Sequence, residues 1–285
     1  MLNESAIGLK TVETFRYTWR DVILYNLSVG AKTEELHYVY EDQLKTIPTF
    51  GVVPVAGTFG TVPYHELPYS PTALIEGMKS KATVHMTHVL KIFKPIPVQG
   101  ELTIEKEIVD VCDRGEGKGA VIMMNVTGKD ADGEAVFTNT IGFLKPQDGG
   151  FGGHPVPRTD IVMPATEPDV IVKGSFPENA AVLYRLTGDT LKLHVDPEFA
   201  QRSGFPRPLL HGLCSLGFAT RILVNELVPG EPDRIKSLEN QFRAPTFPGA
   251  DFEVHIWKSS NGEALFRMVG KDGKSIIDFG RVRYE

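Results

Sequence analysis

The sequence predicts a fold of the α+β class, built from two similar halves. Three observations predict it. Residues 146–177 are crowded with Pro and Gly and carry no hydrophobic period, as is typical of a long linker or crossover. Strand-like runs and turns recur in the same order on both sides of that segment. One strongly apolar helix stands among the strands of the second half. We therefore divide the chain into a first half, 1–145, a linker, 146–177, and a second half, 178–285.

Both halves end in a meander of strands. In the first, the turn 93–100 precedes an alternating strand at 101–105, and the turn 128–133 separates two apolar-rich strands. In the second, the turn 242–249 precedes a strand at 251–256, and the turn 270–273 again lies between strands. Repeated order at a spacing of about 150 residues indicates a duplicated domain of α+β type. The alternative is that such turns recur by chance in a β-rich chain.

The apolar helix is predicted over 210–224, with polar residues returning at Asn225. A helix that is apolar all round is buried, and the small residues at 212, 215, 217 and 219 allow a sheet to approach it closely. The matching place in the first half is 48–57. Proline interrupts or kinks a helix, so Pro54 makes the first half the degenerate one.

The charge balance excludes some classes of partner. The chain has 285 residues with a formal net charge of −6, and basic and acidic residues are interspersed. This argues against nucleic acid and against a membrane surface, and a polyanionic ligand would need local Lys and Arg. No apolar run is long enough to span a bilayer, and the N-terminus lacks the order of a secretory signal. Cys112 and Cys214 form neither a disulfide framework nor a metal-ligand cluster, so buried free thiols in a reducing compartment are expected.

Asp189 and His194 are the candidate acid–base pair. They lie five residues apart, and Gly188 permits an unusual backbone angle just before the carboxylate. A carboxylate and an imidazole that converge can hold one water between them and exchange protons with it near neutral pH. The alternative is a solvated or structural pair, which is common on loops.

A second candidate feature is the start of the apolar helix at His211-Gly212. A helix N-terminus presents free N–H groups, and Gly212 has no side chain to block a ligand. Its N–H can donate to a carbonyl oxygen that gains negative charge. The alternatives are that Gly212 only permits close packing and that His211 caps the helix or orients its neighbours.

These segments together resemble a known family. Residues 184–189, His194-Val195-Asp196-Pro197 and 210–214 look like the signature of MaoC-like dehydratases and enoyl-CoA hydratase 2. The resemblance is closest to the hydratase domain of the peroxisomal multifunctional enzyme type 2. It continues, in the same order, through 20–31, 48–52, 94–97 and 149–153, so that it covers essentially the whole chain.

The resemblance implies a double hotdog fold, in which two long helices are each wrapped by an antiparallel sheet and joined edge to edge. It implies that Asp189 and His194 activate the water that adds to a trans-2-enoyl-CoA, giving a (3R)-3-hydroxyacyl-CoA in fatty-acid β-oxidation. The Gly212 N–H would hold the thioester oxygen, and the interruption at Pro54 would make room for the acyl chain. The expected oxyanion and substrate-binding residues are Gly212, His211, Phe242 and Leu191. No metal and no cofactor are expected.

Assembly and compartment follow from the same resemblance. Hotdog sheet edges are usually paired between subunits, so a homodimer is expected. The peroxisome is the expected compartment, although the C-terminus is not Ser-Lys-Leu, so that the cytosol and the mitochondrion stay open.

The chain departs from the family pattern at several positions. The signature Gly-Asp-x-Asn-Pro-Leu-His has Leu191 and Lys192 in place of Asn-Pro, so an amide that helps to fix the water or the loop is missing. His85-Met86-Thr87-His88 replaces His-Gly-Glu-Gln, which leaves His85 either a ligand-side or a structural residue. The glycines at 115–119 lack the spacing of a dinucleotide-binding motif and are expected to form a turn. Two alternative functions follow: a related acyl-thioester dehydratase, including one that acts on acyl carrier protein, and a catalytically impaired acyl-CoA-binding protein.

Overall fold

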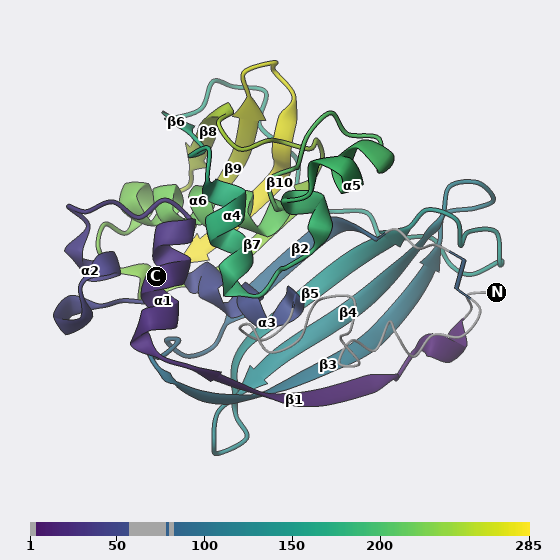
Figure 1. Cartoon of the computed structure of the whole chain (residues 1–285), viewed down its shortest axis with the longest axis horizontal. Coiled ribbons are helices and arrows are strands. Elements are labelled where there is room, and N and C mark those ends of the chain that lie inside the picture. Colours follow the sequence, from purple (N-terminus) through teal and green to yellow (C-terminus); the bar gives the residue numbers. More distant parts are fainter. Residues whose placement is uncertain (1–3, 57–77, 80–82) are drawn as a thin grey trace.

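The described part of the chain forms one ten-stranded antiparallel sheet made of two equivalent halves (Figure 1). A computed structural model describes residues 4–56, 78–79 and 83–285. The strand order is β1-β3-β4-β5-β2-β7-β10-β9-β8-β6. If the strands are numbered within their own half, the order from the outer edge of the sheet inward is first, third, fourth, fifth and second in both halves. The predicted duplication is therefore confirmed by the topology.

The first half contains, in chain order, β1 (Lys10–Tyr17), α1 (Trp19–Ser28), α2 (Leu36–Val39), the 3₁₀ helix η3 (Pro48–Val52), α3 (Val53–Ala56), β2 (Val84–Ile92), β3 (Gly100–Asp113), β4 (Ala120–Lys129) and β5 (Ala135–Lys145). The second half contains β6 (Val170–Ser175), α4 (Ala180–Tyr184), α5 (Pro197–Arg202), α6 (Gly212–Leu227), β7 (Ile235–Phe242), β8 (Asp251–Lys258), β9 (Glu263–Gly270) and β10 (Ser275–Tyr284). Short 3₁₀ turns complete both halves, at Glu4–Ala6, Glu41–Gln43, Arg185–Thr187, Lys192–His194 and Pro232–Arg234.

The two halves meet edge to edge where β2 pairs antiparallel with β7, with His88 opposite Asn240 and Leu90 opposite Leu238. Helix α6 is the central helix of the second half, and all residues from Leu213 to Val224 are buried. Helices α1, α4 and α6 gather on one side of the sheet (Figure 1). This arrangement is the predicted double hotdog.

The glycines of α6 allow close approach, but not always to the sheet as predicted. A Cβ on Gly217 would lie 2.3 Å from Val29 Cγ1, so this glycine admits the chain that follows α1. Gly30, with a φ of +87°, has no room for a Cβ because Phe218 of α6 packs against it. The first half is therefore docked directly onto the central helix of the second.

Helical structure in the first half changes form beside Pro54. The 3₁₀ helix η3, which begins at Pro48, ends at Val52, and α3 begins at Val53, one residue before Pro54. A proline cannot donate the backbone hydrogen bond that would continue a helix from the preceding turn, which agrees with the predicted interruption. The remainder of this stretch, from residue 57, lies outside the described residues, as does any comparison with the length of α6.

The crossover contains a strand that the sequence did not predict. Strand β6 lies within 146–177 and pairs with β8 at the outer edge of the sheet. Its residues alternate only between exposed and partly exposed, so an edge strand of this kind leaves little hydrophobic period. The boundaries 1–145 and 178–285 themselves stay predictions.

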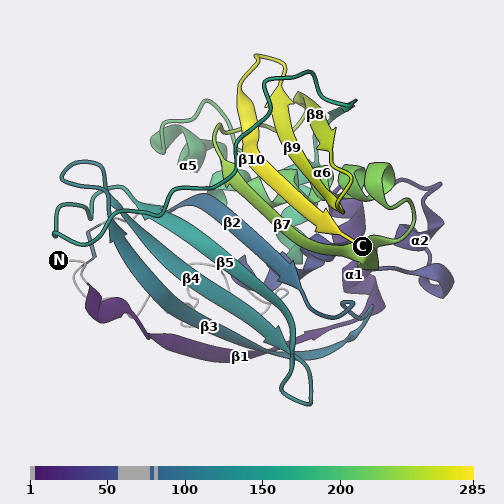
Figure 2. The same ribbon diagram turned by 180° about the vertical axis from the view of Figure 1, so that it is seen from behind.

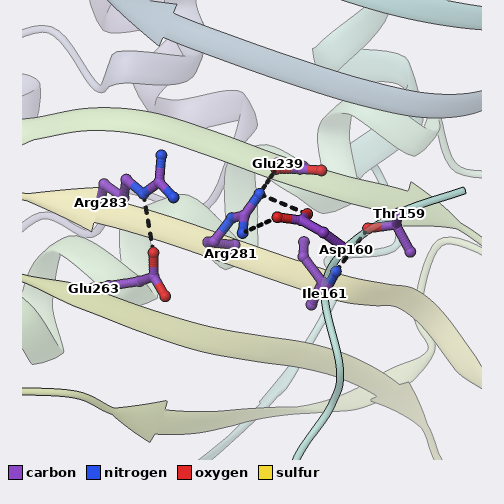
Figure 3. Close-up of polar contacts among 7 residues, drawn as sticks. All are labelled: Thr159, Asp160, Ile161, Glu239, Glu263, Arg281 and Arg283. Carbon is purple, nitrogen blue, oxygen red and sulfur yellow. Dashed lines mark hydrogen bonds and ion pairs between the residues drawn. The ribbon is translucent and has the colours of Figure 1, made fainter. Parts of the chain in front are cut away.

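Two carboxylates fix the path of the crossover. The Asp113 side chain accepts hydrogen bonds from the N–H groups of Gly115, Gly150 and Gly152 at 2.8, 2.8 and 2.7 Å. Farther along, Arg281 of β10 donates to both oxygens of Asp160 at 3.1 and 3.2 Å and to Glu239 of β7 at 2.6 Å (Figure 3). Figure 2 shows the crossover passing over the face of the sheet opposite the helices.

The expectations for the free thiols and for residues 115–119 are confirmed, whereas Cys112 lies with Asp110 and His154 in a group whose spacing could hold a metal ion, which was not expected. Both cysteines are free and buried. Residues 115–119 form the loop between β3 and β4, as predicted. Within the described ranges, no helix has the length and apolar character needed to cross a membrane.

Candidate active site

The loop that carries Asp189 begins with α4 and a 3₁₀ turn at Arg185–Thr187. Gly188 ends this turn with a φ of +132°, a backbone conformation that favours glycine, as the sequence predicted. The N–H of Gly188 donates to Arg185 O at 3.2 Å and closes the turn. Asp189 is thereby directed back toward the start of α6.

Asp189 is a half-buried residue, and its carboxylate accepts a hydrogen bond from the Leu191 N–H at 3.3 Å. Burial raises the pKa of Asp189, and the nearby His194 opposes that rise. A raised pKa lets a carboxyl group carry a proton closer to neutral pH, as a proton donor must. Leu191 was expected to contribute no hydrogen bond, and its side chain has no group that can do so. Its backbone takes part instead.

His194 lies at the end of the next 3₁₀ turn, Lys192–His194. Its Nδ1 lies 2.9 Å from Leu209 O. A carbonyl oxygen only accepts, so Nδ1 donates and the neutral ring has its lone pair on Nε2. His194 is therefore fixed in the tautomer that can take a proton through Nε2.

His211 supports both members of the pair. It occupies the position before the first residue of α6, but its side chain does not cap the helix. Its Nε2–H donates to Asp189 O at 3.1 Å, and its ring stacks on that of His194 with centroids 3.7 Å apart. Burial lowers the pKa of His211 well below its ordinary value, with a further contribution from His194, so this ring is neutral near pH 7. These contacts place His211 against both residues, its orienting role stays a prediction, and the predicted side-chain cap is wrong.

One ligand atom each from Asp189, His194 and His211 lies within 4.8 Å of the others, which would also suit a metal ion. The two rings are inclined by only 25° and stacked, so their lone pairs do not point at one common ion. A carboxyl group beside a fixed imidazole instead suits proton transfer to a small molecule held between them.

Gly212 and Phe242 form the adjoining wall. Gly212 is the first residue of α6, where backbone N–H groups have no partner within the helix. A Cβ on Gly212 would lie 3.2 Å from Phe242 Cδ1, so the ring packs directly over the helix start. Any larger residue at 212 would push the ring aside. The structure thus brings Gly212 and Phe242, both expected to contact the substrate, next to each other.

The structure also brings His85 to this wall. Its ring lies 4.8 Å from that of Phe242 in an edge-on arrangement. The ring centroids of Tyr184 and His211 lie 4.9 Å apart, and Tyr184 is buried. The sequence did not predict this contact. Nothing in the local pattern separates such a tyrosine from an ordinary core aromatic.

Comparison with known proteins agrees with this geometry. The model of the MFE-2 hydratase 2 N-terminal domain matches residues 15–145, and that of the MaoC like domain matches residues 157–277. The 3-hydroxyacyl-thioester dehydratase Y of Mycobacterium tuberculosis is 34% identical over 298 residues, covering 99% of this chain and 98% of the relative.

The chain belongs to the MaoC-like hydratase 2 family. Another relative, a probable enoyl-CoA hydratase 2 of Dictyostelium discoideum, is 32% identical and covers 95% of this chain and 92% of its own length. The solved structure of a MaoC-like dehydratase from Phytophthora capsici superposes with a TM-score of 0.88 at 28% identity, covering 100% of this chain and 98% of the other. The hydratase 2 assignment thus spans both halves, including the junction that carries the candidate site.

Proposed function

We propose that this protein is a hydro-lyase that adds water to the double bond of a trans-2-enoyl-CoA to give a (3R)-3-hydroxyacyl-CoA, and that it also catalyses the reverse dehydration. The observation that carries the proposal is the convergence of Asp189 and His194 beside the N-terminus of α6. The named relatives act on 3-hydroxyacyl thioesters or enoyl-CoA, which supports this class of substrate.

The geometry gives each group a task. A donor from the first turn of α6, Gly212 N–H, polarises the thioester carbonyl and makes C3 electrophilic, an effect typically worth about 3 kcal/mol. His194 Nε2 takes a proton from water as the water oxygen bonds to C3. Asp189, whose pKa is raised by burial, supplies a proton to C2. The proton gained by His194 returns to Asp189 before the next turnover, so atoms and charge balance.

Loss of the conjugated thioester absorbance tests the proposal with crotonyl-CoA and a longer trans-2-enoyl-CoA. We expect Asp189→Asn and His194→Ala each to lower kcat by roughly 10²–10⁴-fold, because each removes one proton-transfer partner. His255→Ala is the matched control, since His255 pairs with Glu253 on β8 and takes no part in the site. Full activity in both site variants would remove this pair from the mechanism.

A catalytically impaired acyl-CoA-binding protein is the second candidate. The observation that favours it is Leu191, which stands where the family signature has an amide side chain. Saturable binding of enoyl-CoA by the wild-type protein without turnover of either substrate would establish the binder and contradict the hydratase. Turnover of an enoyl thioester on acyl carrier protein in preference to the CoA ester would identify the related dehydratase.

The product configuration, assembly and compartment are part of the same proposal. Chiral chromatography of the released 3-hydroxy acid tests the (R) product. We propose a homodimer on the ground that β1 and β6 are the two outer strands of the sheet that the described residues form, and light scattering coupled to gel filtration tests it. Peroxisomal residence rests on the peroxisomal relatives, and imaging of a fluorescent fusion tests it. No cofactor is required by the proposed steps.

A further inference from the structure

Asn240 is a buried amide that makes no side-chain hydrogen bond with the described part of the chain. It lies on β7 between Leu238 and Phe242, and all three side chains face the interior. Asn240 is 1% exposed, and neither its Oδ1 nor its Nδ2 has a hydrogen-bond partner among the residues that the structure describes. Burial of an unsatisfied amide is costly, and a leucine of similar volume would fill the same space without that cost.

The buried polar side chains opposite Asn240 on β2 and next to it on β5 are hydrogen-bonded to one another. Across the β2·β7 pair it faces His88, which is fully buried. Asn139 Nδ2 donates to Gly51 O at 2.9 Å, so Asn139 Oδ1 accepts from His88 Nε2–H at 3.0 Å. Burial lowers the pKa of His88 to about 4, so the ring is neutral and its Nδ1 accepts from His85 Nε2–H at 3.1 Å. This series of hydrogen bonds occupies both ring nitrogens of His88 and Nε2 of His85. Asn240 is left without a protein partner among the described residues.

A β-bulge connects this cluster with the candidate active site. His85 and His88 are three residues apart and would point to opposite faces of a regular strand. The register of β2 against β5 shifts between His85 and Thr87, so both rings reach the same side and contact each other. His85 then packs on Phe242, which packs on Gly212. Asn240 is thus two residues along β7 from the side chain that covers the proposed thioester site.

We infer that Asn240 is a specificity residue that binds a neutral oxygen substituent, a hydroxyl or keto group, on the acyl chain of the thioester. This inference rests on the proposed function, because it places an acyl chain along Phe242. A hydroxyl can donate to Oδ1 or accept from Nδ2, and a keto oxygen can accept from Nδ2. A carboxylate fits poorly, since the neighbouring histidines are neutral and a buried charge needs a paired cation.

Calorimetric titration with saturated CoA esters tests the inference. The probes are hexanoyl-CoA, its 4-, 5- and 6-hydroxy derivatives and 5-oxohexanoyl-CoA. We expect the wild-type protein to bind at least one oxygenated ester about tenfold more tightly than hexanoyl-CoA, as one or two hydrogen bonds allow. Asn240→Leu should abolish that preference while hexanoyl-CoA binds at least as well as before. Gln241→Leu is the matched control, an amide-to-leucine change on the other face of the same strand, and should keep the preference.

Two results would overturn the inference: equal affinity of the wild type for all five esters, or an undiminished preference in Asn240→Leu. If Asn240→Leu does not fold, Asn240→Ala takes its place, and the wild-type series decides alone if neither folds. Saturated esters cannot be hydrated, so this binding test is independent of turnover. Hydration of trans-2-hexenoyl-CoA without any oxygen preference would reject Asn240 as a specificity residue and leave the proposed function standing. An Asn240-dependent preference without hydration of trans-2-hexenoyl-CoA would support Asn240 as a specificity residue and reject the proposed function.

Discussion

The Asp189 carboxyl group is held where its charged form is disfavoured. Burial raises its pKa, and Leu191 N–H and His194 only partly offset that effect. A general acid needs such a shift to hold a proton near neutral pH. The burial that suits Asp189 to the proposed function therefore also destabilises the folded protein when the carboxyl group is ionised.

Replacement of Asp189 by Asn should therefore stabilise the protein in a pH-dependent way. The folded-state pKa lies above the unfolded value of about 3.9, so the folded state binds more protons between the two values. Wild-type stability then falls as pH rises through that window, whereas Asp189→Asn lacks this fall. Urea unfolding across a pH series checks the prediction: the advantage of the variant should be absent in acid and full above the folded pKa. An advantage that shrinks with rising pH would contradict it.

Leu191 offers a test of the amide that the family signature contains. The Leu191 N–H that orients Asp189 is a backbone group and survives substitution. Leu191→Asn should add a side-chain hydrogen bond to the water or loop and raise kcat by roughly two- to tenfold. Leu191→Ala is the control for loss of bulk alone. Equal rates in the two variants would show that the amide has no such role in this chain.

At the scale of single residues, the sequence predicted the groups but not all of their contacts. Chemistry and spacing made Asp189, His194 and Gly212 candidates, and the resemblance to the family gave them their expected roles. Asn240 and His88 were missed because their pairing depends on strand register and on the bulge after His85. A register cannot be inferred from one strand alone, since it is set by the partner and the turn.

At the scale of elements, the buried helices and strands could be predicted from the sequence more readily than the exposed ones. Helix α6 is buried along nearly its whole length and stands out as an apolar run. Strand β6 lies at an edge and packs on the core only through the partly buried Val170 and Val172, so the sequence indicated only a linker there. The crossover is held by single contacts without a hydrophobic period, among them the hydrogen bonds of Asp113 and the packing of Phe151 and Ile161.

Removal of the Asp113 carboxylate should release the start of the crossover. Hydrogen bonds from Gly150, Gly115 and Gly152 hold the pKa of Asp113 at about 2, so the anchor is ionised at all ordinary pH values. Asp113→Ala leaves these N–H groups without their acceptor, and their amide hydrogen exchange should accelerate at least about tenfold. Exchange in α6 should stay unchanged, which distinguishes local release from global unfolding. Unchanged exchange at residues 150 and 152 would show that other contacts hold the loop.

At the scale of the whole molecule, the two halves are joined by more than the β2·β7 pair. Glu35, in the segment between α1 and α2, accepts two hydrogen bonds from Arg221 of α6, both at 2.9 Å, and a third from Asn225. The side chains of Arg221 and Glu35 are only 10% and 12% exposed. Lys45 of the first half also donates to Gly230 O, just beyond α6, at 2.7 Å. The first half thus braces the helix whose N-terminus forms the candidate active site.

Breaking this buried ion pair should destabilise the whole molecule. Arg221→Met leaves a buried carboxylate unpaired, which typically costs about 3–5 kcal/mol in the free energy of unfolding. Burial alone would raise the pKa of Glu35, but hydrogen bonds from Asn225 and the Lys32 N–H, together with Arg221, hold it below its ordinary value. The stabilisation is therefore full above the unfolded pKa of about 4.3 and is lost as pH falls through the lowered folded pKa.

Urea unfolding of Arg221→Met, Glu35→Gln and the double variant at neutral and acid pH separates the contributions. The double variant should be more stable than Arg221→Met, because no unpaired charge remains in it, and the deficit of Arg221→Met should shrink in acid as Glu35 becomes protonated. A loss below about 1 kcal/mol in Arg221→Met would place the pair among ordinary surface ion pairs. Loss of hydratase activity in step with unfolding, and not before it, would show that the brace acts through the stability of the joined halves and not through the geometry of the site.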